Sequence, residues 1–246
     1  MVQAALTVRP LDAALLKDFL KREGATLVGV GDITEALSHE ITHLNRGIAL
    51  AVNRGLNQDS IALLLRLQRS TEKWLKERGF RSFAIPPDSD RIRGKLIAKI
   101  YHLFSHKTAA TCSGLGWIGK NGLLINNTYG SKLSWGTVLT NAPFEPDNPL
   151  TESQCGECDL CVRHCPSGAV SGSLWSRDEP LKKLVNYEKC RALKKLRPRF
   201  EEKPNCGLCI TICPFSRNGH YKGTCGTERY QAGQTKTERN SVTLKS

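Results

Sequence analysis

The sequence predicts an α+β fold, in which a layer domain of alternating helices and strands is followed by a smaller domain organised by cysteines. Apolar residues recur at helix and strand spacing up to about residue 145, and three prolines follow within residues 141–149. Eight cysteines then fall between residues 155 and 213. Residues 218–246 are polar and rich in Gly, Thr and Lys, which is typical of a disordered tail. We therefore expect three segments, 1–145, 146–217 and 218–246.

The elements of the first segment follow from periodicity. Apolar residues at helical spacing predict helices over residues 11–22, 60–78 and 92–104. Asp59 or Ser60 can cap the second helix, Gly79 ends it, and Asp90 opens the third. Short apolar runs predict strands over residues 25–30, 47–52, 80–85, 123–126 and 133–139.

Eight of the ten cysteines form one split pattern. Its halves are Cys155-x-x-Cys158-x-x-Cys161-x-x-x-Cys165-Pro166, and Cys190 followed by Cys206-x-x-Cys209-x-x-x-Cys213-Pro214. The first run is that of bacterial ferredoxins, in which three cysteines bind one iron–sulfur cluster and the fourth binds the other. Two 4Fe–4S clusters need eight thiolates, and the pattern supplies eight. The sequence therefore predicts a ferredoxin-like double-cluster domain that transfers electrons one at a time.

The same spacing predicts which cysteines share a cluster. Cluster one would be bound by Cys155, Cys158, Cys161 and Cys213, and cluster two by Cys165, Cys190, Cys206 and Cys209. Zinc and disulfides are the alternatives. Zinc ribbons use pairs of Cys-x-x-Cys without the Cys-Pro endings. Disulfide frameworks are typical of short secreted chains, whereas this chain has 246 residues and no secretory signal at its start. Cys112 and Cys225 have no ligand spacing to a neighbour.

The formal net charge of +13 is concentrated in a basic segment, residues 182–203. Such a segment favours a polyanion as partner, with RNA as the leading candidate. A solvated basic face, or compensation for two negatively charged clusters, would explain the same charge. No run approaches the roughly 20 apolar residues of a membrane span. Because the thiols must stay reduced, we expect a cytoplasmic protein without a membrane partner.

A glycine-rich motif precedes the strand predicted at residues 123–126. It reads Gly114-Leu115-Gly116-Trp117-Ile118-Gly119-Lys120-Asn121. Glycines let the backbone approach a ligand closely, and lysine adds a point charge for a phosphate or carboxylate. The motif matches neither the dinucleotide fingerprint nor the Walker loop. We expect it to bind a cofactor through Gly114, Gly116, Trp117, Gly119, Lys120 and Asn121, the alternative being a glycine-rich turn around a buried tryptophan.

The motif and the cysteine pattern together resemble the epoxyqueuosine reductase family, which is related to the cobalamin-dependent reductive dehalogenases. The resemblance covers roughly residues 10–217. It implies a nitroreductase-like α/β domain holding a base-off cobalamin, to which the two clusters deliver electrons. It also implies an oxidoreductase that reduces epoxyqueuosine in tRNA, which completes queuosine synthesis. The implied partners are an electron donor such as a flavodoxin or ferredoxin, and tRNA bound through the basic segment.

Two departures from that family keep other functions open. The family has a proton-donating aspartate shortly before the glycine motif, whereas residues 101–110 contain no acidic residue. His106 or Tyr101 is the candidate catalytic donor, because histidine titrates near neutral pH; His106 could equally be structural. The family's helical-repeat domain, which helps grip tRNA, has no counterpart after Cys213. The alternative is therefore a double-cluster electron-transfer protein, or a cobalamin reductase without tRNA activity.

Overall fold

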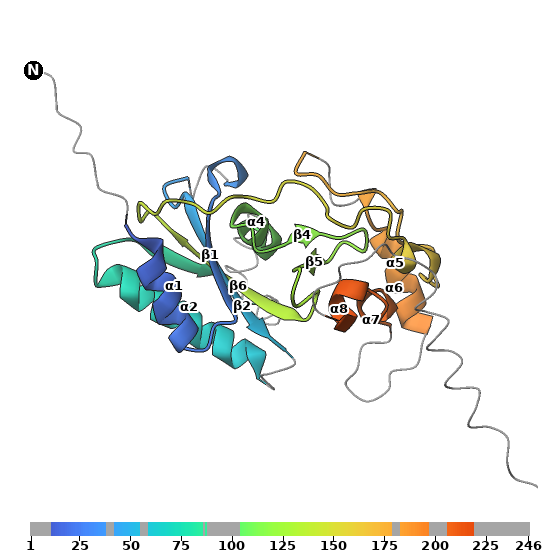
Figure 1. The fold of residues 1–246 in the computed structure, drawn as a ribbon, viewed down its shortest axis with the longest axis horizontal. Helices are drawn as coiled ribbons and strands as arrows, with labels where there is room; N and C mark the ends of the chain where they lie inside the picture. The colour runs from blue at the N-terminus through green and yellow to red at the C-terminus, as the bar shows by residue number, and fades with distance from the viewer. Residues whose placement is uncertain are drawn as a thin grey trace, which may run out of the picture.

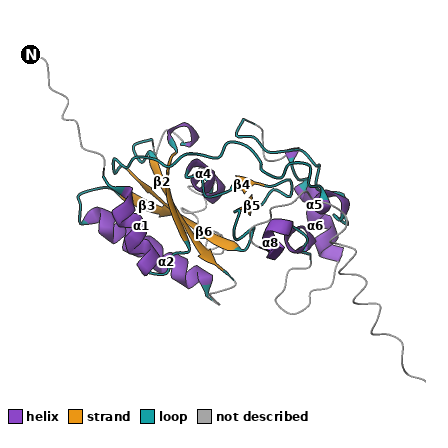
Figure 2. Ribbon diagram, in the orientation of Figure 1, coloured by secondary structure: helices purple, strands orange, loops and turns teal. Residues whose placement is uncertain are grey.

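The structure is a computed structural model that describes residues 11–37, 42–54, 59–85, 87, 104–178, 183–196 and 206–218. It combines helices and strands, so the predicted mixed fold is confirmed (Figures 1 and 2). Tyr101 and the predicted helix before Phe104 lie outside the described residues. The predicted tail also lies outside them, apart from Asn218.

A four-stranded antiparallel sheet forms the centre of the first half. Its order is β1-β2-β6-β3, with β1 at Leu27–Asp32, β2 at Arg46–Asn53, β6 at Leu133–Thr140 and β3 at Ser82–Ile85. These strands match four of the predicted runs, with ends that differ by a few residues.

Two helices, α1 (Ala13–Arg22) and α2 (Ser60–Lys76), cover one face of the sheet (Figure 1). Asp59 caps α2 by accepting a hydrogen bond of 2.9 Å from the Ala62 N–H, as predicted. Alternate residues of β2, among them Ile48 and Leu50, are fully buried against these helices because strand side chains alternate between faces.

Helix α4 (His106–Cys112) packs on the opposite face, and the sequence did not predict it. It comes very close to β1. A Cβ on Gly29 would lie 2.8 Å from the Ser113 Cβ, and one on Gly31 would lie 2.6 Å from the Cys112 Cβ. Glycine at both positions therefore lets α4 lie directly on the strand. Next to α4 is a hairpin of β4 (Trp117–Ile118) and β5 (Leu124–Ile125), of which only β5 was predicted.

The cysteine-rich half consists of loops and short helices at the other end of the molecule (Figure 1). The helices are α5 (Leu160–Arg163), α6 (Tyr187–Leu196), α7 (Leu208–Thr211) and α8 (Pro214–Asn218). Pro214 occupies the first position of α8, where a helix needs no N–H. It therefore redirects the chain after Cys213 by starting a helix.

The two halves share one hydrophobic core. The core on the α4 side contains Trp117, Ile118 and Trp175, and four cysteines of the pattern pack against it. The predicted linker is tied to β1, because Asp147 and Val30 exchange hydrogen bonds of 2.8 Å in both directions. Within the residues described, no helix is long and apolar enough to cross a membrane.

Candidate functional site

Four cysteines converge on one small cavity, which we call the cluster-one cavity. Its lining includes Cys155, Cys158, Cys161 and Cys213. The structure thus brings Cys213 to three cysteines that lie more than fifty residues earlier, and these are the four that the spacing assigns to cluster one. The chain folds this way because α5 and α7 pack against each other and Pro214 then turns the chain into α8.

The electrostatics of the thiols separate the two sets of cysteines. Burial raises the pKa of the Cys161 thiol to about 12, and negative charge on Cys155, Cys213 and Cys209 adds to the effect. Burial also raises the pKa of Cys209, which is influenced in addition by Cys206, Cys190 and Cys165. Each buried thiol is therefore surrounded mainly by the other cysteines of its proposed cluster. Crowded thiolates of this kind need bound cations, which iron supplies.

Among the described residues, the cysteines form neither disulfides nor a group around a single metal ion. All nine of them are free thiols, so no disulfide joins them. No group of three or more His, Cys, Asp or Glu side chains in the described part of the chain could hold a single metal ion, as a zinc site would require.

The glycines of the motif allow three close approaches. Gly114 has a φ of +66°, and a Cβ there would lie 2.4 Å from the Asn148 carbonyl oxygen. A Cβ on Gly116 would lie 2.5 Å from the Ile125 carbonyl oxygen. One on Gly119 would lie 2.9 Å from the Asn121 Oδ1, with the Cys155 Sγ in ordinary contact at 3.5 Å. The first two glycines therefore meet the protein's own backbone, and the third lies against a cluster ligand.

The polar end of the motif forms one wall of the cluster-one cavity. Lys120 and Asn121, each 8% exposed, line it together with Phe215. The Asn121 side-chain amide donates a hydrogen bond of 3.0 Å to the Cys209 carbonyl. Trp117 makes an edge-to-face contact with Phe215, with ring centroids 5.0 Å apart. The motif therefore joins the α/β half to the segment that carries three of the cysteines.

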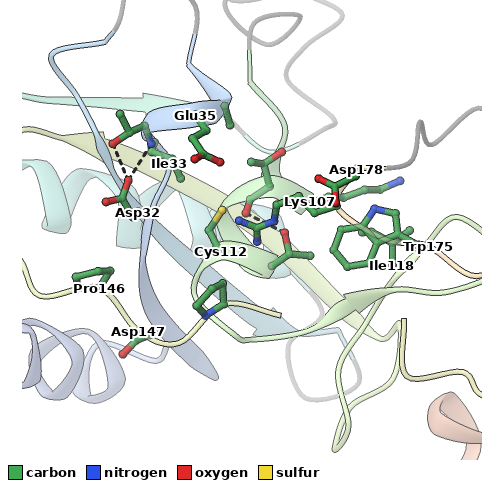
Figure 3. Close-up of a pocket in the computed structure, with 16 residues that line it drawn as sticks. Asp32, Ile33, Glu35, Lys107, Cys112, Ile118, Pro146, Asp147, Trp175 and Asp178 are labelled. Atoms are coloured by element: carbon green, nitrogen blue, oxygen red, sulfur yellow. Dashed lines mark hydrogen bonds between the residues drawn. The ribbon is translucent and has the colours of Figure 1, made fainter. Parts of the chain in front are cut away.

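A second and much larger cavity, of about 910 Å³, lies between the two halves; we call it the large cavity (Figure 3). It is lined by the end of β1 and the short helix η1 (Thr34–Ala36), by α4, by Ile118, by residues 146–149 and by the loop at residues 175–178. Figure 3 shows Cys112 at the middle of the lining, with Asp32 and Glu35 on one side and Ile118 and Trp175 on the other.

The large cavity combines apolar walls with charged groups. Ile118 and Trp175 supply apolar surface, and Lys107 and Arg177 supply positive charge. Burial raises the pKa of the Cys112 thiol, and the positive charge of Arg177 acts in the opposite direction. Sequence patterns do not identify Trp175, Arg177 or Cys112 as site residues, because none of them belongs to a recognisable motif.

One short segment separates the two cavities. Ile118 lines the large cavity, Lys120 lines the cluster-one cavity, and only Gly119 lies between them. Consecutive Cα atoms are 3.8 Å apart, so the Cα atoms of Ile118 and Lys120 are at most about 7.6 Å apart. Two residues that are separated only by Gly119 in the chain therefore line the two different cavities.

The remaining predicted residues lie elsewhere. His106 is buried, its Nδ1 lies 2.8 Å from the Thr137 Oγ1, and it lines neither cavity. Of the basic segment, residues 183–196 are described. They include α6, whose last turn carries Lys194 and Lys195 at the surface.

Comparison with known proteins agrees with this arrangement. Residues 154–216 match the 4Fe-4S double cluster binding domain family. Epoxyqueuosine reductase of Listeria monocytogenes is 36% identical over 117 residues, which is 47% of this chain and 30% of that enzyme. The Synechocystis enzyme is 33% identical over 123 residues, 45% of this chain and 39% of that enzyme. The matched part thus spans well under half the length of these relatives.

Solved structures extend the likeness to most of the chain. An epoxyqueuosine reductase in complex with an epoxyqueuosine-modified tRNA-Tyr stem loop aligns with a TM-score of 0.59 and 18% identity, covering 87% of this chain and 67% of that chain. A catabolic reductive dehalogenase in complex with 3-bromo-4-hydroxybenzoic acid aligns with a TM-score of 0.64 and 15% identity, covering 96% of this chain and 37% of that chain. The resemblance to the epoxyqueuosine reductase family is therefore confirmed, in sequence over almost half of this chain and in fold over most of it.

Proposed function

We propose that this chain is an iron–sulfur reductase of the epoxyqueuosine reductase type, with a nitroreductase-like α/β domain over residues 1–145 and a double-cluster domain over residues 146–217. The observation that carries the proposal is the position of Gly119 between the cluster-one cavity and the large cavity. A redox centre in the first cavity would lie next to a molecule in the second. The names of the sequence relatives and of the solved structures support the same reaction class.

The cysteines fit two 4Fe–4S clusters by number and grouping. Cys155, Cys158, Cys161 and Cys213 would hold cluster one, and Cys165, Cys190, Cys206 and Cys209 would hold cluster two. Hydrogen bonds from backbone N–H groups stabilise such ligands, and the Ala169 N–H donates one of 3.3 Å to the Cys165 Sγ. When bound, the clusters supply one-electron transfer and a cobalamin supplies the reducing centre that breaks the carbon–oxygen bond.

The large cavity fits a corrinoid. Its volume of about 910 Å³ is close to the upper end of the roughly 300–1,000 Å³ found for ligand sites. Ile118 and Trp175 offer apolar surface to a flat macrocycle, and Lys107 and Arg177 offer donors to its polar rim.

Removing an epoxide oxygen as water consumes two electrons and two protons, so the site needs a proton source. In this proposal the electrons come from a carrier such as a flavodoxin or ferredoxin. His106 and Tyr101 remain the candidate proton donors from sequence. For His106 to act, its ring must leave Thr137, whereas Cys112 already lines the large cavity.

The basic segment is the proposed surface for tRNA, because neutralising phosphates with lysine and arginine supplies most non-specific affinity for nucleic acid. Binding of this kind weakens steeply with salt. The electron-transfer alternative is supported by the position of His106 away from the large cavity. In that case the chain would bind clusters without converting tRNA.

An anaerobic cobalamin titration of the reconstituted protein, with cobalt followed by EPR, tests the proposal. We expect one base-off corrinoid per chain. Thr108 lines the large cavity on α4, so Thr108→Trp should abolish binding. Arg69→Trp, on an exposed position of α2, is the matched control. Equal binding by Thr108→Trp would place the corrinoid elsewhere, and no binding at all would favour the electron-transfer alternative.

The substrate is tested separately with an epoxyqueuosine-modified tRNA stem loop and mass spectrometry of the product. Conversion to queuosine by the corrinoid-loaded, reduced protein is the expected result. A protein that binds corrinoid and clusters but leaves the stem loop unchanged would instead be a cobalamin reductase.

A further inference from the structure

Lys120 is a largely buried residue whose ammonium group has no hydrogen-bond or ion-pair partner among the described residues. Its side chain is 8% exposed, and in the part of the chain that the structure describes it is the one lysine or arginine that is buried. No hydrogen bond or ion pair within that part involves its ammonium group. Lysine is almost never buried unless it is paired, because a desolvated charge is costly.

The cluster-one cavity contains the missing partner. Lys120 lines it together with the four cysteines of cluster one. A 4Fe–4S core held by four thiolates carries a net negative charge, and reduction adds one more negative charge. An ammonium group and an anionic cluster that share one small cavity compensate each other's charge.

We propose that Lys120 is the counter-charge of cluster one and raises its reduction potential. A positive charge stabilises the reduced, more negative form of the cluster more than the oxidised form, and net charge is one of the factors that set cluster potentials. The described lysines near cluster two, on α6, are exposed and therefore screened by solvent and salt. The asymmetry favours electron flow from cluster two to cluster one, which lies beside the large cavity. This inference rests on the cluster assignment made above.

The position of Lys120 also distinguishes this role from the one expected of the motif. A lysine that binds a phosphate or carboxylate of a ligand in the large cavity should line that cavity. Lys107 and Arg177 do so, and Lys120 does not. Its charge is directed at the cluster.

Redox titration of the full, reconstituted protein followed by EPR tests the proposal. Lys120→Met removes the charge and keeps the length of the side chain, and Lys120→Arg keeps the charge. Lys132→Met, at an exposed position of the same half, is the control. We expect Lys120→Met to lower the ratio of reduced to oxidised protein for one cluster at least tenfold at a given solution potential. For a one-electron couple, a tenfold change in this ratio corresponds to a reduction potential lower by 59 mV. The arginine variant should restore most of the shift, and the control should match the parent protein.

Iron content separates failure of this proposal from failure of the cluster assignment. A parent protein without two clusters would overturn the assignment, and with it the role of Lys120. A Lys120→Met protein with full iron and unchanged potentials would overturn the role of Lys120 alone. If Lys120→Met loses iron, the proposal requires Lys120→Arg to recover both the iron content and the reduction potential. An arginine variant with the same low iron content as the methionine variant would also refute a role of the charge.

Discussion

The crossed pairing of the cysteines makes iron content a sharp test of the site. Cys161 and Cys165 are four residues apart, yet we assign them to different clusters, whereas Cys161 and Cys213 are assigned to the same one. This assignment rests on the four cysteines that line the cluster-one cavity, and on the spacing of the remaining four. Pairs of alanine substitutions therefore have different effects according to the cluster that they affect, not according to their separation in the sequence.

The expected iron content follows directly. The parent protein should bind about eight irons, four in each cluster. Cys161→Ala with Cys213→Ala removes two ligands of cluster one and should leave about four irons in an intact cluster two. Cys161→Ala with Cys165→Ala removes one ligand from each cluster, so no cluster keeps four thiolates. EPR of this variant should then show no intact 4Fe–4S signal.

The assay is anaerobic reconstitution followed by iron and sulfide determination and EPR of the reduced protein. Cys112→Ala is the matched control, because Cys112 is the last residue of α4, is buried against β1 and lies outside both sets of cysteines. It should keep about eight irons. An intact four-iron cluster in Cys161→Ala/Cys165→Ala, together with none in Cys161→Ala/Cys213→Ala, would refute the crossed pairing.

Two further substitutions test how the halves are joined and what His106 does. At Gly130 (φ +57°) a Cβ would lie 2.5 Å from the Ser216 Cα. Gly130→Ala should therefore displace α8, which lowers both the iron content and the urea concentration at the midpoint of unfolding. Gly79→Ala is the control, because Gly79 also has a positive φ (+80°) but no atom lies within 4 Å of its added Cβ. It should lower the free energy of unfolding only by the roughly 1–2 kcal/mol of a left-handed residue. Equal losses of stability and iron in the two variants would argue against a contact between Gly130 and α8. If His106 donates a proton, His106→Ala should lower turnover of the tRNA stem loop about 10²–10⁴-fold with iron unchanged. Thr137→Val removes the same hydrogen bond but keeps the imidazole, so matching effects in the two variants would mark His106 as structural.

The elements that the sequence predicted well are those whose signals are local. The apolar spacing of α2 and its Asp59 cap lie within one stretch of chain, and both appear in the structure as expected. Helix α4 was missed because it is short and carries small residues such as Ala109 and Ala110 in place of a large apolar stripe. Its position depends on Gly29 and Gly31 of a distant strand, which no local pattern reveals.

The candidate site also has one part that local sequence patterns predict and another part that they do not. The grouping of the cysteines follows from spacing, because the wrapping of a chain around a cluster is a local matter. The large cavity is formed by five separate segments, and Trp175 and Arg177 come from the insert between the two cysteine runs. The sequence also suggested that the glycines face a ligand. In the structure Gly114 and Gly116 face backbone carbonyls, and Gly119 alone lies beside a cluster ligand.

The shared core bears on the choice between an enzyme and a carrier of electrons. A carrier needs its clusters close to the surface and gains nothing from a cavity of about 910 Å³ beside them. Here the cavity exists only because both halves contribute, α4 and β1 from one and the Trp175 loop from the other. Residues 146–149, expected to be a simple linker, form part of its lining and are bonded to β1 through Asp147. Keeping such a space open forgoes the hydrophobic packing that could fill it, and a bound molecule compensates for that loss. The cavity therefore favours a reaction carried out inside this chain over transfer of electrons to a separate protein.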